Sequence, residues 1–122
     1  MCKDLKTVKA GDSVTMTSTV SLLSTNNNGI IVPGTRVDTS TDTVKVGAGQ
    51  LVKGWEAGVL GACEGESRRL VLGPSLAWGT RGVEGRVPGN SSIVIDVSID
   101  HVERDLVLNF LDQISSGTFK RG

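Results

Sequence analysis

The chain has 122 residues, of which 13 are basic and 13 acidic, so its formal net charge is zero. A chain of this length is typical of one domain with one hydrophobic core. The charges are scattered singly, which excludes the basic patch of a nucleic-acid binder or a membrane-surface protein. No apolar run approaches the ~20 residues of a membrane span. We therefore expect a soluble single domain with neither nucleic acid nor a membrane span.

The first half of the chain is typical of strands and turns. From Ser13 to Leu23 apolar residues alternate with Thr and Ser, which predicts a strand with one solvated face. The segment STNNNG follows as a turn, because Asn and Gly tolerate positive φ. Residues 29–40 then predict a short strand or a bulged edge strand, because they contain Pro33. Thr43–Val46 predicts a further short strand.

The segment Gln50–Leu60 predicts a short amphipathic helix. Apolar residues recur there at helical spacing, although two glycines disfavour a helix. The apolar residues are Leu51, Val52, Trp55 and Val59. The segment ESRRLVLG then predicts a strand, and the glycine-rich residues 74–92 predict a long loop of the kind that usually carries function. Ser92–Val102 alternates cleanly and is the clearest strand.

The last segment predicts an amphipathic helix that ends near Gly117, since apolar residues fall on one helical stripe. The stripe consists of Leu106, Val107, Phe110, Leu111 and Ile114. We expect an α+β domain over residues 1–102, with an antiparallel sheet around one short central helix. Residues 103–122 form a helical extension or linker. This helix either docks on a partner or neighbouring domain, or covers the domain's own core.

Covalent and metal chemistry find little support in the composition. The only histidine is His101, in a strand, and tyrosine is absent, so a nucleophile lacks an obvious base. One histidine and two distant cysteines match no usual zinc pattern. The segment that contains Asp38 and Asp42 predicts a polar turn rather than a calcium-binding loop. We expect neither a metal nor a cofactor.

One continuous stretch of the chain reads VGAGQLVKGWEAGVLGACEGESRRLVLGPSLAWGTRGVEGRVPGNSSIVIDVSI. This stretch resembles the FKBP-type peptidyl-prolyl cis-trans isomerases. It is similar, in order, to that family's motifs G-x-x-x-V-I-x-G-W-E-x-G, M-x-x-G-E-x-R, P-x-x-x-A-Y-G and I-P-x-x-A-x-L-x-F-D-V. RVDTS resembles the family's F-D-S-S. The resemblance implies a twisted antiparallel sheet wrapped around a short helix, with a shallow apolar pocket between them that receives a proline ring.

The resemblance also assigns roles to individual residues. It implies catalytic positions at Asp38 on the pocket rim, Trp55 as the pocket floor and Trp78 in place of a loop tyrosine. It implies substrate-binding positions at Val37, Leu51, Val52 and Ile95. Of these, Val37 and Ile95 replace phenylalanines, and the backbone N–H of Val52 donates to a ligand carbonyl.

The implied function is prolyl isomerisation that assists protein folding, with proline-containing polypeptides as substrates. Several aromatic positions hold other residues, including Val37, Ile95 and Ser18, the last in place of an early-strand tyrosine, and Val83 stands where many members carry a histidine. We therefore expect a wider pocket, weak activity and reduced affinity for macrolide FKBP ligands. The alternative is a non-catalytic FKBP-like module that binds a protein partner.

The segment LGACEGE resembles the secretory-pathway branch of the family, in which this cysteine pairs with one near the N-terminus. That resemblance implies a disulfide between Cys2 and Cys63 and a location in the endoplasmic reticulum. From composition alone the two cysteines either pair or remain a buried and a terminal thiol. The alternative location is the cytoplasm.

Overall fold

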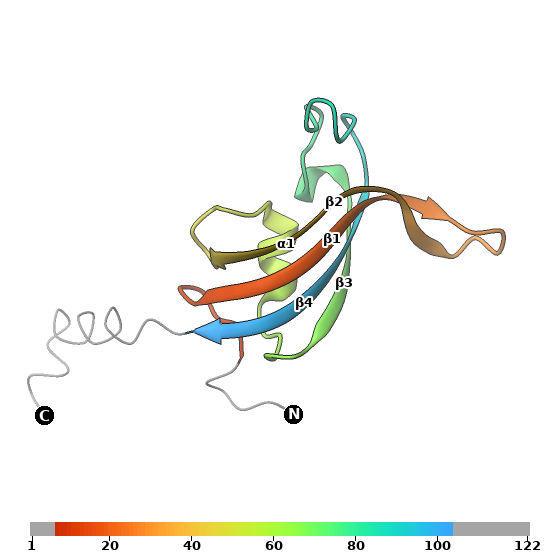
Figure 1. Cartoon of the computed structure of the whole chain (residues 1–122). Coiled ribbons are helices and arrows are strands. Elements are labelled where there is room, and N and C mark those ends of the chain that lie inside the picture. Colours follow the sequence, from red (N-terminus) through yellow and green to blue (C-terminus); the bar gives the residue numbers. More distant parts are fainter. Residues whose placement is uncertain (1–6, 104–122) are drawn as a thin grey trace, which may run out of the picture.

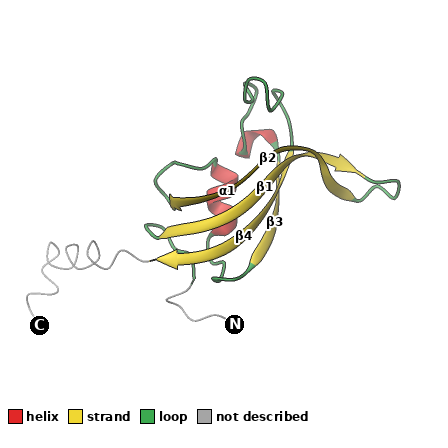
Figure 2. Ribbon diagram, viewed as in Figure 1, coloured by secondary structure: helices red, strands yellow, loops and turns green. Residues whose placement is uncertain are grey.

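The computed structural model describes residues 7–103. Its strands form one antiparallel sheet in the order β2-β1-β4-β3, and the sheet curves around the helix α1 (Figures 1 and 2). The elements are β1 (Ser13–Thr25), β2 (Ile31–Lys45), α1 (Lys53–Val59), β3 (Ser67–Leu72), the 3₁₀ turn η2 (Pro74–Leu76) and β4 (Ile93–Glu103). The α+β fold with a sheet around one short helix is therefore confirmed.

β1 and β2 form one long hairpin that projects beyond the rest of the sheet (Figure 1). The sequence predicted two short strands here, whereas the structure has a single strand from Ile31 to Lys45. That prediction was wrong because β2 pairs with the whole of β1. The strand therefore continues through the polar residues that lie between the two predicted strands. β2 lies at the sheet edge, and the register shifts opposite Ser21, so Pro33 is accommodated as expected of an edge strand.

The two faces of the sheet differ as the alternation in β1 predicted. On the outer face threonines pair across β1 and β2, with 2.8 Å between the hydroxyls of Thr15 and Thr43 and 3.0 Å between those of Thr17 and Thr41. The inner face packs on α1 and forms the core. The fully or nearly fully buried core residues include Val14, Met16, Val59, Ile93, Ile95, Val97 and Ile99. The period-two pattern thus separates a solvated face from the face that packs on α1.

Two glycines of α1 allow the helix to lie close to β3. A Cβ at Gly54 would lie 2.6 Å from Leu72 Cδ2, and a Cβ at Gly58 would lie 2.6 Å from Leu70 Cδ2. Glycine costs helix stability, yet here the missing side chain removes a steric barrier to packing. The short helix is therefore held by its contacts with the sheet rather than by its own propensity.

The N-terminal segment is tied to the turn that follows α1. Val8 N–H donates to the Ala62 carbonyl, and Gly61 N–H donates to the Val8 carbonyl, both over 2.9 Å. Cys63, in the same turn, is disulfide-bonded. Its expected partner Cys2 lies outside the described residues. Of the expected helical extension, residues 103–122, the structure describes only Glu103, which is the last residue of β4, and residues 104–122 lie outside the described residues.

Within residues 7–103 no helix is long and apolar enough to cross a membrane. The same residues contain no cluster of three or more His, Cys, Asp or Glu side chains that could hold a metal ion.

Candidate functional site

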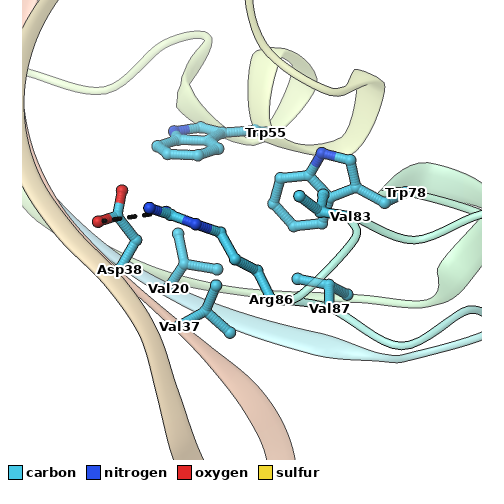
Figure 3. Close-up of a pocket in the computed structure, with 8 residues that line it drawn as sticks. All are labelled: Val20, Val37, Asp38, Trp55, Trp78, Val83, Arg86 and Val87. Atoms are coloured by element: carbon cyan, nitrogen blue, oxygen red, sulfur yellow. Dashed lines mark ion pairs between the residues drawn. The ribbon is translucent and has the colours of Figure 1, made fainter.

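A pocket of ≈ 260 Å³ lies between α1, the β1–β2 hairpin and the loop that follows η2 (Figure 3). Its wall is mostly apolar, with two tryptophan rings, four valines and one charged pair. The lining residues are Val20, Val37, Asp38, Trp55, Trp78, Val83, Arg86 and Val87. A concave apolar site with few polar groups is the usual form of a small-ligand or peptide side-chain pocket.

Trp55 enters the pocket from the first turn of α1. Val52 stands at the N-terminal cap, and its carbonyl accepts the N–H groups of Trp55 and Glu56, each over 3.0 Å. The indole ring is half-buried against the core. Its Nε1–H is buried and has no hydrogen-bond partner among residues 7–103. A buried donor without a hydrogen-bond partner costs stability.

The opposite side of the pocket comes from the loop after η2. Val83 and Val87 exchange two backbone hydrogen bonds of 2.8 Å, which close a tight turn. Gly82 N–H also donates to the Trp78 carbonyl over 3.0 Å. These bonds hold Trp78, Val83 and Val87 at the pocket even though they lie in a loop without strands or α-helices.

The charged pair lies at the pocket mouth. Arg86 Nη1 is 3.8 Å from Asp38 Oδ1, and the two side chains are 59% and 49% exposed. Asp38 comes from β2 and Arg86 from the loop, so the ion pair spans the pocket (Figure 3). An ion pair this exposed contributes little to stability. Its charges therefore matter more for what the pocket attracts than for the fold.

The structure gathers four of the seven predicted site residues around this pocket: Val37, Asp38, Trp55 and Trp78. The other three are not among the lining residues. Ile95 is 0% exposed in the core, opposite Val20 in the sheet. Leu51 and Val52 are half-buried and pack on the core cluster. The Val52 N–H has no hydrogen-bond acceptor within residues 7–103.

Sequence reasoning missed Val20, Arg86 and Val87. It placed the β1 contribution at Ser18, which is 3% exposed and does not line the pocket, whereas Val20 on the same inner face does. The inward alternation in β1 could have nominated Val20. No sequence signal indicated Arg86, because its role depends on how the loop folds back toward β2.

The comparison with known families agrees with this architecture. The model of the FKBP-type peptidyl-prolyl cis-trans isomerase family matches residues 5–100. The chain belongs to this family. The match includes every strand and the helix up to residue 100, and thus the whole FKBP pocket described above.

Individual members of the FKBP family are similar to this chain. FK506-binding protein 2 of Dictyostelium discoideum is 42% identical over 76 residues, which cover 58% of this chain and 57% of that protein. Peptidyl-prolyl cis-trans isomerase FKBP2 of Homo sapiens is 38% identical over 81 residues, or 62% of this chain and 57% of that protein. Peptidyl-prolyl cis-trans isomerase FPR2 of Saccharomyces cerevisiae is 38% identical over 93 residues, which cover 76% of this chain and 67% of that protein. The chain thus spans little more than half of the first two relatives.

Proposed function

We propose that this protein catalyses the cis–trans isomerisation of X–Pro peptide bonds in polypeptides and thereby assists their folding. The observation that carries the proposal is the apolar pocket between Trp55, Trp78 and the valines, in an FKBP-family domain. Relatives at 38% identity bear the name peptidyl-prolyl cis-trans isomerase. The residues at the pocket fit a reaction that needs neither a nucleophile nor a metal.

Catalysis of X–Pro isomerisation requires selective binding of a twisted amide. Rotation about a peptide bond has a barrier of ~18 to 20 kcal/mol, because resonance is lost when the amide twists. A catalyst lowers the barrier by binding the twisted state more tightly than the planar one. A water-poor pocket contributes, because it does not solvate the planar carbonyl.

Each group at the pocket has a role in this scheme. Trp55 and Trp78 supply large apolar surfaces against which a proline ring packs. The free Val52 N–H donates to a substrate carbonyl, and Asp38 provides a polar group at the rim. Leu51 and Ile95 support the pocket from the core.

Weak catalysis follows from the small size of the other wall residues. Four valines, at positions 20, 37, 83 and 87, line the pocket, and a valine covers less of a proline ring than an aromatic side chain does. We therefore also propose a reduced affinity for macrolide FKBP ligands, which would be measured by their inhibition of the isomerase activity.

A proline-limited refolding assay tests the proposed function. At micromolar concentration, the protein should accelerate the slow refolding phase of a substrate protein above its spontaneous rate, which is set by uncatalysed isomerisation. An unchanged slow phase would contradict the enzyme proposal. Heat-inactivated protein at the same concentration is the control for non-specific effects.

The second candidate function is a non-catalytic module that binds proline-containing partners. The thin valine wall and the ion pair across the pocket mouth favour it. It predicts chemical-shift changes at Trp55 and Trp78 on addition of a proline peptide without acceleration of isomerisation. One NMR sample reports both binding and exchange and so separates the two candidates.

The disulfide-bonded Cys63 supports a location in the secretory pathway, specifically the endoplasmic reticulum. Disulfides persist in oxidising compartments and are rare in the cytosol. Within this proposal residues 1–102 are the isomerase domain and residues 103–122 an extension that docks on a partner or a neighbouring domain. Fluorescence microscopy of the tagged full-length protein tests the location, and a cytosolic signal would contradict it.

A further inference from the structure

The pocket is apolar except for one pair of opposite charges. Among its eight lining residues, only Asp38 and Arg86 carry charge. Charged groups at the rim of a binding site contribute more to selectivity than to affinity. This charged pair is therefore the feature of the pocket that can distinguish one proline-containing segment from another.

The arginine of this pair has unused hydrogen-bond donors. Its 3.8 Å separation from Asp38 is longer than a hydrogen bond, and within residues 7–103 its guanidinium donates no hydrogen bond. Arg69 differs, because it donates two bonds to Asp96, of 2.6 and 3.2 Å. A guanidinium has five donors in a planar fork that suits a carboxylate. Arg86 is thus prepared to bind a further anion.

The backbone holds Arg86 at the pocket while its side chain stays movable. The Arg86 N–H donates to the Val83 carbonyl over 2.9 Å, inside the turn closed by Val83 and Val87. The side chain is 59% exposed and extends across the pocket toward Asp38 (Figure 3). A ring that enters the pocket would push this side chain outward, toward the residues that flank the bound proline.

We propose that Arg86 makes the pocket prefer proline segments with an acidic residue next to the proline. This inference rests on the proposed function, since it names the substrate class of the same pocket. The displaced guanidinium then pairs with the substrate carboxylate instead of the more distant Asp38 carboxylate. A lysine at the same substrate position is disfavoured, because it meets the outward-turned cation.

The experiment compares peptides that differ only beside the proline. One set places Glu, Gln or Lys before the proline in an otherwise neutral peptide, and a second set places them after it. NMR exchange spectroscopy measures the catalysed isomerisation of each. We expect the Glu peptide to be isomerised about two- to five-fold faster than the Gln peptide at one of the two positions, as befits an ion pair in contact with water.

Variants assign the preference to Arg86. Arg86→Gln should bring the Glu-to-Gln ratio to about one, and Arg86→Lys should retain part of the preference because the charge remains. Arg86→Glu should invert it in favour of the Lys peptide. Arg81→Gln is the matched control: it removes an exposed arginine of the same loop that does not line the pocket, and it should leave the ratio unchanged.

Equal rates for Glu and Gln peptides at both positions would overturn the inference, and so would a preference that survives Arg86→Gln. If no peptide is isomerised, including neutral ones, the proposed function fails separately. Peptide dissociation constants from chemical-shift titration then provide the same ratio, and equal values for Glu and Gln overturn the inference. High salt should reduce the preference, because it screens exposed charges.

Discussion

Trp55 links the core of the molecule to its pocket. Its ring packs on the core cluster and also lines the pocket, while its Nε1–H has no partner among the described residues. A residue selected only for packing would rarely leave a buried donor unpaired. The unpaired donor of Trp55 costs stability, and it belongs to a residue that lines the proposed substrate pocket.

Replacement of this ring should abolish the pocket. Trp55→Ala removes one of the two tryptophan rings of the pocket, so we expect peptide binding and isomerase activity to be lost. Stability should fall by up to the ~3 to 5 kcal/mol typical of a truncated buried aromatic residue. Chemical denaturation measures the stability, and NMR titration measures binding.

Val71→Ala is the control for this variant, because Val71 is an exposed apolar residue on β3 outside the pocket. It should retain both activity and fold. A folded Trp55→Ala variant with wild-type peptide affinity would contradict the assignment of this pocket.

Glu66 and Arg68 connect the end of α1 to the start of β3. The Arg68 guanidinium donates to Glu66 over 2.6 Å and to the carbonyls of Gly58 and Leu60 over 3.0 and 3.1 Å. Glu66 also accepts the Cys63 N–H over 2.9 Å. Arg68 thus satisfies carbonyls at the helix C-terminus that have no intrahelical partner.

This arrangement predicts a pH-dependent contribution from Glu66. The hydrogen bond from Arg68, and then that from the Cys63 backbone, lower the pKa of Glu66 below its ordinary value. A lowered folded-state pKa stabilises the protein above the unfolded-state pKa, and this contribution disappears as pH falls through the folded-state pKa. Glu66→Gln should therefore lower Tm at pH 7, and the difference should shrink toward pH 3.

Thermal unfolding at a series of pH values measures this effect. Glu84→Gln, in an exposed glutamate of the pocket loop, is the control and should change Tm little at any pH. A Tm difference for Glu66→Gln that stays constant from pH 7 to pH 3 would show that the charge of Glu66 does not contribute.

At the scale of elements, the position of α1 against β3 determines the pocket. The helix has only seven residues, from Lys53 to Val59, which is too short to be stable alone. Gly54 and Gly58 bring it against Leu70 and Leu72, and Trp55 lies between the two glycines. The helix position, and with it the pocket floor, depends on these two close approaches.

A side chain at Gly54 should displace the helix. Its Cβ would lie 2.6 and 2.9 Å from the Leu72 methyl carbons and 3.0 Å from Leu76 Cβ, and Leu72 is buried in the core. Overpacking of this kind costs ~1 to 3 kcal/mol, which offsets or exceeds the ~1 kcal/mol that alanine gains in a helix. We expect Gly54→Ala to destabilise the protein and to weaken peptide binding.

Gly73→Ala is the matched control, because a Cβ there meets nothing within 4 Å and the backbone φ of −73° suits alanine. Its stability should be unchanged or slightly raised, since the unfolded chain loses freedom. Equal stabilities of the two variants in chemical denaturation would contradict the proposed close packing of α1.

At the scale of the whole molecule, the disulfide at Cys63 ties down the turn between α1 and β3. That turn already receives backbone hydrogen bonds from the N-terminal segment at Val8. A disulfide stabilises mainly by restricting the unfolded chain, typically by 2 to 4 kcal/mol. Cys63→Ser should therefore lower Tm under oxidising conditions.

Addition of a reductant supplies the control for this variant. Reduced wild-type protein should unfold at the lower temperature of Cys63→Ser, whose own Tm should not respond to the reductant. Identical Tm values for the oxidised wild type and Cys63→Ser would show that the disulfide does not stabilise the fold.

Much of the fold could be predicted from the sequence because its signals are local. Strict alternation in residues 92–102 and the apolar spacing around Trp55 depend only on neighbouring residues, so both elements are found where they were expected. The union of two predicted strands into β2 could not be predicted. It depends on pairing with β1, which lies far away in the chain.

The pocket likewise has features that could be predicted from the sequence and features that could not. Sequence by itself determined the fold family, the two tryptophans and Asp38, because the motifs that carry them are continuous in the chain. Only the tertiary structure decided that Val20 rather than Ser18 lines the pocket, that Ile95 is fully buried, and that Arg86 faces Asp38. The physical reason is that pocket walls are formed by residues from separate elements, and only the packing of a strand edge against a folded loop brings those residues together.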